Sequence, residues 1–158
     1  MRRKDREITE IGEILKIADR AKILHLGLFD GEYPYVVPLH YGYEYTGGKL
    51  VFYMHSAKEG HKLDLIGDGA QVCAELDCDA ELVSGGDVPC RYGSYFASVI
   101  ARGRAEPVTE EQEKCRAMAI LMKHQTGRDF SFTPEMAAAV AVIRVVSENF
   151  TAKSRPKA

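Results

Sequence analysis

One short segment, residues 52–62 with the sequence FYMHSAKEGHK, combines a hydroxyl, two lysines and two imidazoles where a strand is expected to give way to a helix. Ser56 followed three positions later by Glu59 is the capping-box pattern that begins a helix. The amides of a first helical turn lack partners within the helix and carry the positive end of its dipole, so they attract anions. With Lys58 and Lys62 close by, the segment is a candidate phosphate site. The alternative is a capped helix whose lysines are simply solvated.

Two of the five histidines, His40 and His55, fall where neighbouring strands could present them to one cleft. Alternation places His40 with Pro38 on one face of its strand, and His55 at a facing position of the next strand. An unperturbed imidazole changes its charge near neutral pH, so this pair could tune a bound cofactor or donate a proton. For His25 and His124 we expect an ordinary surface-facing or hydrogen-bonded role.

No familiar catalytic or metal-binding motif accompanies these residues. The cysteines, Cys73, Cys78, Cys90 and Cys115, lie 5, 12 and 25 positions apart and form no CxxC pair. The sequence also lacks HExxH, GxGxxG, GxxxxGK[ST] and a GxSxG nucleophile elbow. We therefore expect reduced thiols and no metal site, and the catalytic side chains stay unknown.

The spacing of apolar residues and the capping signals predict the helices that must support these groups. An amphipathic helix is predicted over residues 8–19. A longer helix is predicted to begin with a capping box at Thr109 and to end at Gly127. A short helix follows Ser56, and a helical turn opens at residues 133–134.

Alternating apolar residues predict six strands. These cover residues 22–29, 33–45, 49–55, 71–77, 94–108 and 139–152, and residues 78–93 are expected to form a loop. Asp30-Gly31 and Gly47-Gly48 supply tight turns between the first three strands. Because regular alternation of strand and helix is missing, a mostly antiparallel, closed sheet is favoured over a parallel one.

Pro38 interrupts the strand expected over residues 33–45. A proline has no amide hydrogen for the ladder, so the strand is either at a sheet edge there or bulged. Something other than a strand is therefore expected to approach the backbone at Pro38.

Composition limits the class of protein. A chain of 158 residues fits one domain, predicted to span residues 1–158. Its 21 basic and 23 acidic residues give a net charge of −2, which disfavours a nucleic-acid partner. The longest apolar run, over residues 136–143, is far shorter than the ~20 residues of a membrane helix, and the basic start precedes a polar segment. We expect a cytoplasmic protein with no membrane partner.

Four segments together resemble one known family. They are MRRKDREIT at the start, GEYPYVVPLHYGYEY over 31–45, FYMHSAKEGHKLDLI over 52–66 and SYFASVIARGRAE over 94–106. Their combination is similar to that of the FMN-binding split-barrel proteins, the pyridoxamine 5′-phosphate oxidase-like superfamily, and most closely to its nitroimidazole-resistance subgroup. The resemblance implies a mainly β fold with flanking helices, a six-stranded antiparallel split β-barrel, and a homodimer with FMN in the clefts between subunits.

The resemblance also implies where FMN lies. The strand at Pro38 runs beside the isoalloxazine ring, and the turn after His55 resembles a cradle for the phosphate and ribityl groups. The implied cofactor-binding residues are Val37, Pro38, Leu39, His40, Tyr41, His55, Ser56, Ala57, Gly60, Lys62, Ser98 and Val99.

We therefore expect a flavin-dependent oxidoreductase that passes electrons from a nicotinamide cofactor or another reductant to a small electrophile, such as a nitroaromatic compound. Lys58 and Lys62 stand where the resemblance to true pyridoxamine phosphate oxidases would require several arginines, so that particular oxidase activity is not implied. The alternative is a non-catalytic protein that binds flavin, a deazaflavin-like cofactor or haem, with His40 or His55 as an axial ligand. A third possibility is an empty barrel that serves as a dimeric scaffold.

Overall fold

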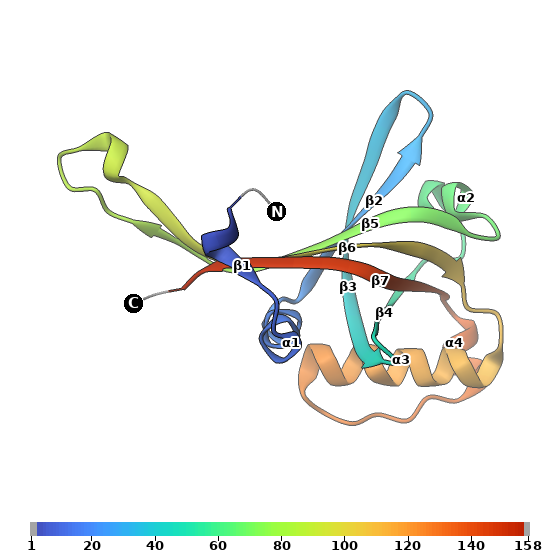
Figure 1. Ribbon diagram of the computed structural model, residues 1–158. Helices are drawn as coiled ribbons and strands as arrows, with labels where there is room; N and C mark the ends of the chain where they lie inside the picture. Colours follow the sequence, from blue (N-terminus) through green and yellow to red (C-terminus); the bar gives the residue numbers. More distant parts are fainter. Residues whose placement is uncertain (1–2, 157–158) are drawn as a thin grey trace.

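A computed structural model describes residues 3–156, and its strands form a closed antiparallel ring (Figure 1). The ring contains β2 (Ile23–Asp30), β3 (Tyr33–Thr46), β4 (Lys49–Ser56), β7 (Ala141–Arg155), β6 (Gly93–Pro107) and β5 (Ala70–Val83), in that order, with β5 returning to β2. The two-residue strand β1 (Glu7–Ile8) pairs with β7 outside the ring. The predicted six-stranded antiparallel barrel is confirmed, although the ring is uneven. The ends of the predicted domain, residues 1–2 and 157–158, lie outside the described residues.

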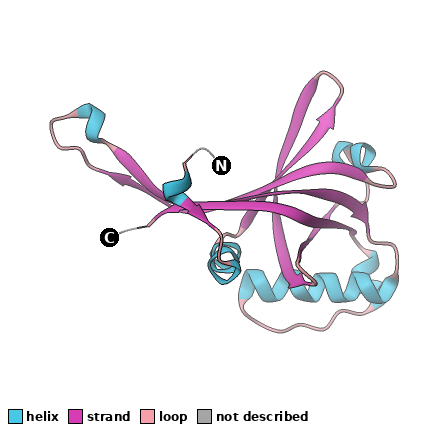
Figure 2. Ribbon diagram, in the orientation of Figure 1, coloured by secondary structure: helices cyan, strands magenta, loops and turns pink. Residues whose placement is uncertain are grey.

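The helices lie around this ring (Figure 2). They are α1 (Ile11–Arg20), α2 (His61–Ile66), α3 (Glu111–Thr126) and α4 (Pro134–Ala138), with short 3-10 turns at Lys4–Arg6 and Pro89–Arg91. Within residues 3–156, no helix combines the length and the apolar character that crossing a membrane requires.

The hydrophobic core fills the inside of the ring. Inward side chains alternate along each strand, as Leu24, Leu26 and Leu28 do on β2. The buried face of α1 joins the same cluster. Tyr41 ties α1 to β3, because its hydroxyl donates to the carbonyl oxygens of Ala18 (2.7 Å) and Ala21 (3.1 Å).

One side of the ring is also covered on its outside. β4 is buried on both faces, because Val51 and Tyr53 face outward into a second apolar cluster with Met118 of α3. α3 also passes close to β3 at Gly42, where a Cβ atom would lie 2.5 Å from the backbone of Leu121. We call β4 with α3 and α4 the covered wall.

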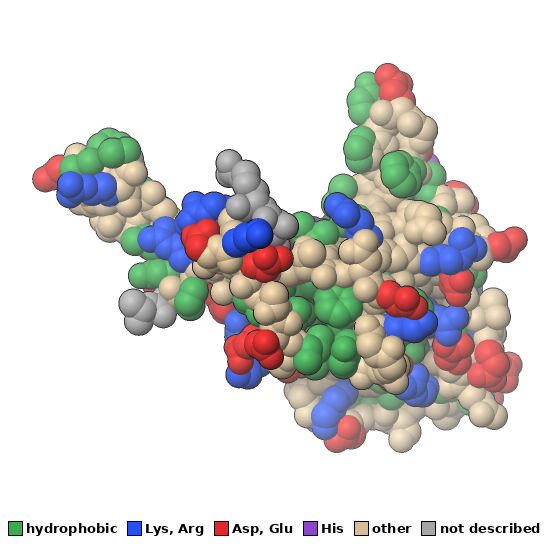
Figure 3. All heavy atoms as spheres, in the orientation of Figure 1, with side chains coloured by type: hydrophobic (Ala, Val, Ile, Leu, Met, Phe, Trp, Pro, Cys, Tyr) green, Lys and Arg blue, Asp and Glu red, His purple; other side chains and the backbone are tan. Residues whose placement is uncertain are grey.

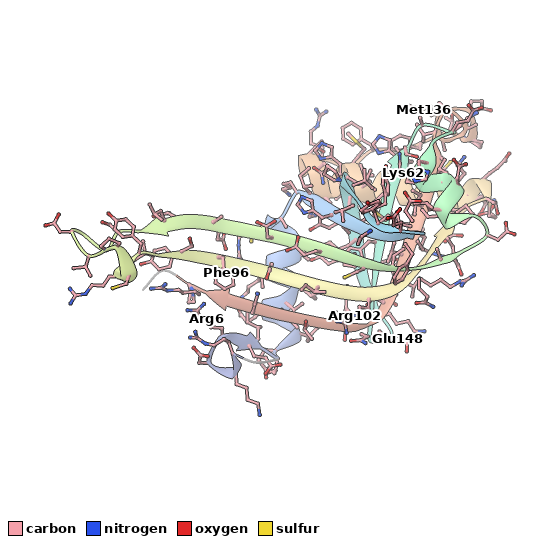
Figure 4. All side chains as sticks on the ribbon, turned by 90° about the horizontal axis from the view of Figure 1, so that it is seen from above. Arg6, Lys62, Phe96, Arg102, Met136 and Glu148 are labelled. Atoms are coloured by element: carbon pink, nitrogen blue, oxygen red, sulfur yellow. The ribbon has the colours of Figure 1, made fainter. Side chains whose placement is uncertain are left out.

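The outward face on the other side of the ring is open to solvent. Phe29 on β2 is 83% exposed, and Val36 on β3 is 59% exposed. We call the outward face of β2, β5 and residues 33–40 of β3 the bare wall. Figure 4, which views the molecule from above, shows β5, β6 and β7 running side by side along their length.

The loop predicted over residues 78–93 is confirmed for residues 84–92, but residues 78–83 and 93 belong to strands. β5 and β6 continue as a hairpin that projects far from the ring, which we call the β-arm (residues 79–95; Figure 1). The register shifts between Cys78 and Glu81, and Asp79 has a positive φ of 62°. This extra residue breaks the alternation of side chains, which is why the pattern did not indicate a strand.

The predicted start of α1 is displaced by three residues and that of α3 by one. α1 begins at Ile11, because Ile8 belongs to β1. Glu110, and not Thr109, caps α3, and its carboxylate accepts hydrogen bonds from two first-turn amides at 3.0 and 2.7 Å. The predicted helical turn is confirmed, with Thr133 as its cap.

Candidate functional site

The ring opens between β3 and β4. Their ladder ends at the pair Tyr41 and Met54. Beyond that pair, residues 33–40 of β3 are bonded to β2, and His55 and Ser56 are bonded to β7. We call the opening between these two segments the split. The β2–β3 hairpin rises away from the ring at this point (Figure 1).

Pro38 lies on the β3 side of the split. It is paired with His25 of β2, while no described strand lies along the opposite edge of β3 at this position. The predicted sheet edge at Pro38 is therefore confirmed. The missing amide hydrogen costs no ladder bond where a ladder is absent.

The split brings the two predicted histidines together. Burial lowers the pKa of His55, and the nearby charge of His40 lowers it further. His55 Nδ1 is buried and has no hydrogen-bond partner among the described residues. His40 is exposed, and its Nδ1 lies 3.1 Å from Gln125 Oε1. A buried ring nitrogen without a partner is costly, so His55 marks the split as a place where a ligand could supply a hydrogen bond.

The turn after β4 differs from the predicted capping box. Ser56 is the last residue of β4, and its hydroxyl donates to the carbonyl oxygen of Ala57 (2.8 Å) instead of capping a helix. α2 begins later, with Gly60 at its N-cap and a φ of 140° that favours glycine. Lys62 is half-buried in the first turn of α2 and has no hydrogen-bond or ion-pair partner within residues 3–156, whereas Lys58 is exposed. Lys62 is therefore available to an anionic ligand.

His61 makes contacts that hold the structure around the split. Its Nε2 lies 2.7 Å from Asp30 Oδ2 at the tip of the β2–β3 hairpin, and its ring packs edge-on against Tyr35 at 5.1 Å. These contacts tie α2 to the hairpin and so hold the two sides of the split together. The partners are 31 positions apart, so no local pattern in the sequence indicated the pair.

Four predicted cofactor-binding residues turn their side chains inward. Val37 and Leu39 pack against the core, and Tyr41 and Val99 are fully buried in it. The hydroxyl of Tyr41 is already used by α1. The side chains of Tyr41 and Val99 are thus unavailable to a ligand at the surface of this chain, because alternation places them inside the ring.

Ser98 does not border the split of its own chain. It lies on the outward face of β6, between Asp77 of β5 and Lys153 of β7. β5 and β2 separate β6 from β3, which corresponds to about 14 Å at ordinary strand spacing.

His124 has the ordinary, hydrogen-bonded role predicted for it, and His25 has a carboxylate beside it. His124 Nε2 lies 3.0 Å from the carbonyl oxygen of Ala21, and burial lowers the pKa of this half-buried imidazole. His25 Nδ1 lies 3.2 Å from Glu75 Oε2 on the bare wall.

The fold and the split define an antiparallel barrel whose ring is opened between two neighbouring strands. A profile of the pyridoxamine 5′-phosphate oxidase family matches residues 10–154, and this chain belongs to that family.

Solved structures with the same fold include a "putative 5-nitroimidazole antibiotic resistance protein" from Bacteroides thetaiotaomicron. It is 30% identical to this chain, with a TM-score of 0.78 over 94% of this chain and 86% of the other. The flavocytochrome Anf3 from Azotobacter vinelandii has a TM-score of 0.78 at 19% identity, over 99% and 72% of the two chains. An FAD and haem binding protein from Mycobacterium smegmatis has a TM-score of 0.78 at 16% identity, over 96% and 74%. The last two likenesses show the fold alone. No curated protein matches the chain in sequence.

Proposed function

We propose that this protein binds FMN in the split and reduces a small electrophile, such as a nitroaromatic compound. The observation that carries the proposal is the buried, unpartnered Nδ1 of His55, which lies where the β3–β4 ladder is open. Membership of the family and the 30% identity to a protein named for nitroimidazole resistance support it. Two further structures with the same fold carry flavin- and haem-related names, which agrees with the proposal.

The residues of the split fit a flavin nucleotide. The open edge of β3 around Pro38 offers backbone groups to a planar ring, and Lys62 offers a cation to a phosphate. We assign the ribityl chain to the Ser56–Ala57 turn and Gly60, which lie between His55 and Lys62 in the sequence. His55 is largely uncharged near neutral pH because its pKa is lowered, so it can donate one hydrogen bond and accept another. A bound flavin supplies the electron transfer, while the protein positions it and excludes water.

We also propose that the site is completed by a second copy of the chain. The β-arm and the β2–β3 hairpin carry hydrophobic side chains at their tips (Figure 3), among them Leu82 at 68%, Phe29 at 83% and Tyr33 at 70% exposure. A two-stranded arm is marginally stable alone in water, and exposed apolar groups of this size are typical of contact surfaces. A two-fold dimer through the bare walls would cover them. It would also bring the partner's Ser98 toward the split.

The first test is the visible absorption spectrum of the purified protein, with mass spectrometry of any molecule that heat releases. We expect FMN in a near-equal ratio to chains, and reduction of a 5-nitroimidazole when a nicotinamide reductant is added. A haem Soret band would instead favour the non-catalytic alternative. A colourless protein that also fails to bind added FMN would overturn the proposal.

Lys62→Ala tests the phosphate end of the site. We expect the Kd for FMN to rise about tenfold or more, because a hydrogen bond to a charged group is worth roughly 1.5–3 kcal/mol. Lys58→Ala is the matched control, since Lys58 is exposed and lies four positions earlier. Equal affinity in both variants would remove Lys62 from the site.

Leu82→Asp tests the second copy. We expect this variant to sediment as a monomer, because a charge placed on the β-arm would be buried without a partner in the dimer. Met136→Asp is the control, since Met136 is 55% exposed on α4, away from the β-arm (Figure 4), and should leave the dimer intact. A wild-type chain that is monomeric at all concentrations would contradict the proposal.

A further inference from the structure

Three side chains that no sequence motif links come together on the bare wall. They are His25 on β2 and Glu75 and Asp77 on β5, and their ligand atoms all lie within 4.8 Å of one another. His25 and Glu75 are 50 positions apart in the sequence. Spacing along the chain could not reveal this group, because the pairing of two strands creates it.

The sheet fixes the positions of these donors. His25 and Glu75 face each other directly across the β2–β5 ladder, and Asp77 follows Glu75 on the same face of β5. All three are on strands, which hold a site more rigidly than loops do. The distance from His25 Nδ1 to Glu75 Oε2 is 3.2 Å. Two donors bound tetrahedrally to one zinc ion at about 2.1 Å are separated by about 3.4 Å, so this pair already has a suitable spacing.

The charges of the group favour a cation. Glu75 and Asp77 lie two positions apart on β5, so their carboxylates are on the same face of the sheet. The carboxylate of Asp77 has no hydrogen bond or ion pair among the described residues. Lys153 of β7 is a nearby positive charge that acts on Glu75, but its Nζ lies 5.5 Å from the ring centre of Phe96 and makes no ion pair within residues 3–156. Two adjacent carboxylates thus remain incompletely neutralised.

We propose that His25, Glu75 and Asp77 bind a divalent transition-metal ion, with Zn²⁺ as the best match to one imidazole and two carboxylates. Imidazole and carboxylate groups are ordinary zinc ligands. Soft ions such as Cu(I) prefer sulfur ligands, which this group lacks. Three protein ligands leave the fourth position of a tetrahedral ion open to water or to another small ligand. In the proposed dimer the bare wall, with Asp77 next to Ser98 of β6, would face the partner, so the proposal is tested by metal binding and not by flavin content.

A second histidine–carboxylate pair in the same chain provides a control. His61 and Asp30 lie 2.7 Å apart, which is closer than His25 and Glu75, but they belong to no group of three potential ligands in the described part of the chain. If a histidine–carboxylate pair alone were sufficient, both places would bind the ion equally.

The experiment is a calorimetric titration of untagged, full-length, chelator-treated protein with Zn²⁺, together with the visible spectrum after addition of Co²⁺. We expect one ion per chain and a tetrahedral Co²⁺ spectrum. Asp77→Asn and His25→Ala should each weaken Zn²⁺ binding by about 10- to 100-fold or more. Loss of a residue that only hydrogen-bonds a metal ligand already has an effect of this size, and loss of a ligand should have at least the same effect. Lys153→Gln should strengthen binding, because it removes a competing charge.

His61→Ala should leave the Zn²⁺ affinity unchanged. Asp77→Asn is nearly isosteric at an exposed position, so a loss of binding in this variant reports the ligand and not the fold. Absence of Zn²⁺ binding, or binding that is indifferent to Asp77→Asn and His25→Ala, would overturn the proposal. Because flavin content is measured separately on the same samples, failure here is distinguishable from failure of the proposed FMN site.

Discussion

β4 and β2 belong to the same ring, yet β4 is buried on both faces whereas the outward face of β2 is open. The difference is α3, which covers β4 and the nearby part of β3. On the covered wall, outward positions such as Val51 and Tyr53 serve packing. On the bare wall, the outward positions hold His25, Pro38 and Glu75 instead. The outward side chains of the two walls therefore meet different surroundings, packed helix on one wall and solvent on the other.

The sharpest test of this difference is a glycine substitution on each wall. We expect Gly42→Val to destabilise the protein by about 3 kcal/mol or more, because its Cβ would lie 2.5 Å from the backbone of Leu121 and α3 would have to move. Gly27→Val on the bare wall should cost less than about 1 kcal/mol, since its Cβ would meet only Cys73, at 3.4 Å and beyond. Urea unfolding measures the free energy of unfolding of both variants. Equal losses of stability would mean that the two walls do not differ in packing at these glycines.

Tyr41→Phe should give the next largest effect. The change removes the hydroxyl that donates to the carbonyls of Ala18 and Ala21, of which the Ala21 carbonyl keeps His124 Nε2, so we expect a loss of about 1–2 kcal/mol in the free energy of unfolding. Tyr45→Phe, on the same strand and 39% exposed, is the control and should change stability little. If both variants unfold alike, the hydroxyl of Tyr41 does not hold α1 in place.

The pH dependence of stability tests the environment of His55 at the split. Its pKa is lowered in the folded chain, so the unfolded chain binds more protons in the window below its ordinary pKa of about 6.5. The stabilisation is complete above this value and is lost as the pH falls toward the lowered pKa. We expect His55→Gln to reduce the fall in Tm between about pH 7.5 and 5.5 by a few degrees at most.

Part of that fall should persist in His55→Gln, because burial also lowers the pKa of His124. An unchanged pH profile in His55→Gln would show that this imidazole is not desolvated in solution.

The smallest expected effect is at the base of the β-arm. Asp79 adopts a positive φ of 62°, and its carboxylate accepts from Arg20 at 2.9 Å on the surface. Asp79→Gly relieves the backbone strain but removes this exposed ion pair, so we expect a change within about 0.5 kcal/mol. A large loss in thermal denaturation would mean that the ion pair, and not the backbone conformation, fixes the β-arm.

Much of the fold could be predicted from the sequence because most strands obey a strict alternation. Leu24, Leu26 and Leu28 alternate with exposed or polar positions, and the structure places them inside the ring as predicted. The β-arm could not be predicted, because the extra residue near Asp79 interrupts the alternation and no core selects its apolar positions. The start of α2 was misplaced because Ser56 uses its hydroxyl within the turn.

Part of the candidate site could also be predicted from the sequence, and part could not. Pro38 indicated an open edge through its missing amide hydrogen, and strand alternation brought His40 and His55 to one place. The contact of His61 with Asp30 and the meeting of His25 with Glu75 depend on which strands pair, and a single sequence does not contain that information locally. Residues that depend on pairing therefore became visible only in the folded chain.

The position of β7 in the ring has a consequence for synthesis of the chain. β7 is the last ring strand to be translated, and it pairs with β4, β6 and β1. Until residues 141–155 emerge from the ribosome, β4 and β6 are the two unpaired edges of an open sheet, which are templates for association with other chains. The ring can therefore close only after residues 141–155 have been made, and until then these two edges stay open to pairing with other chains.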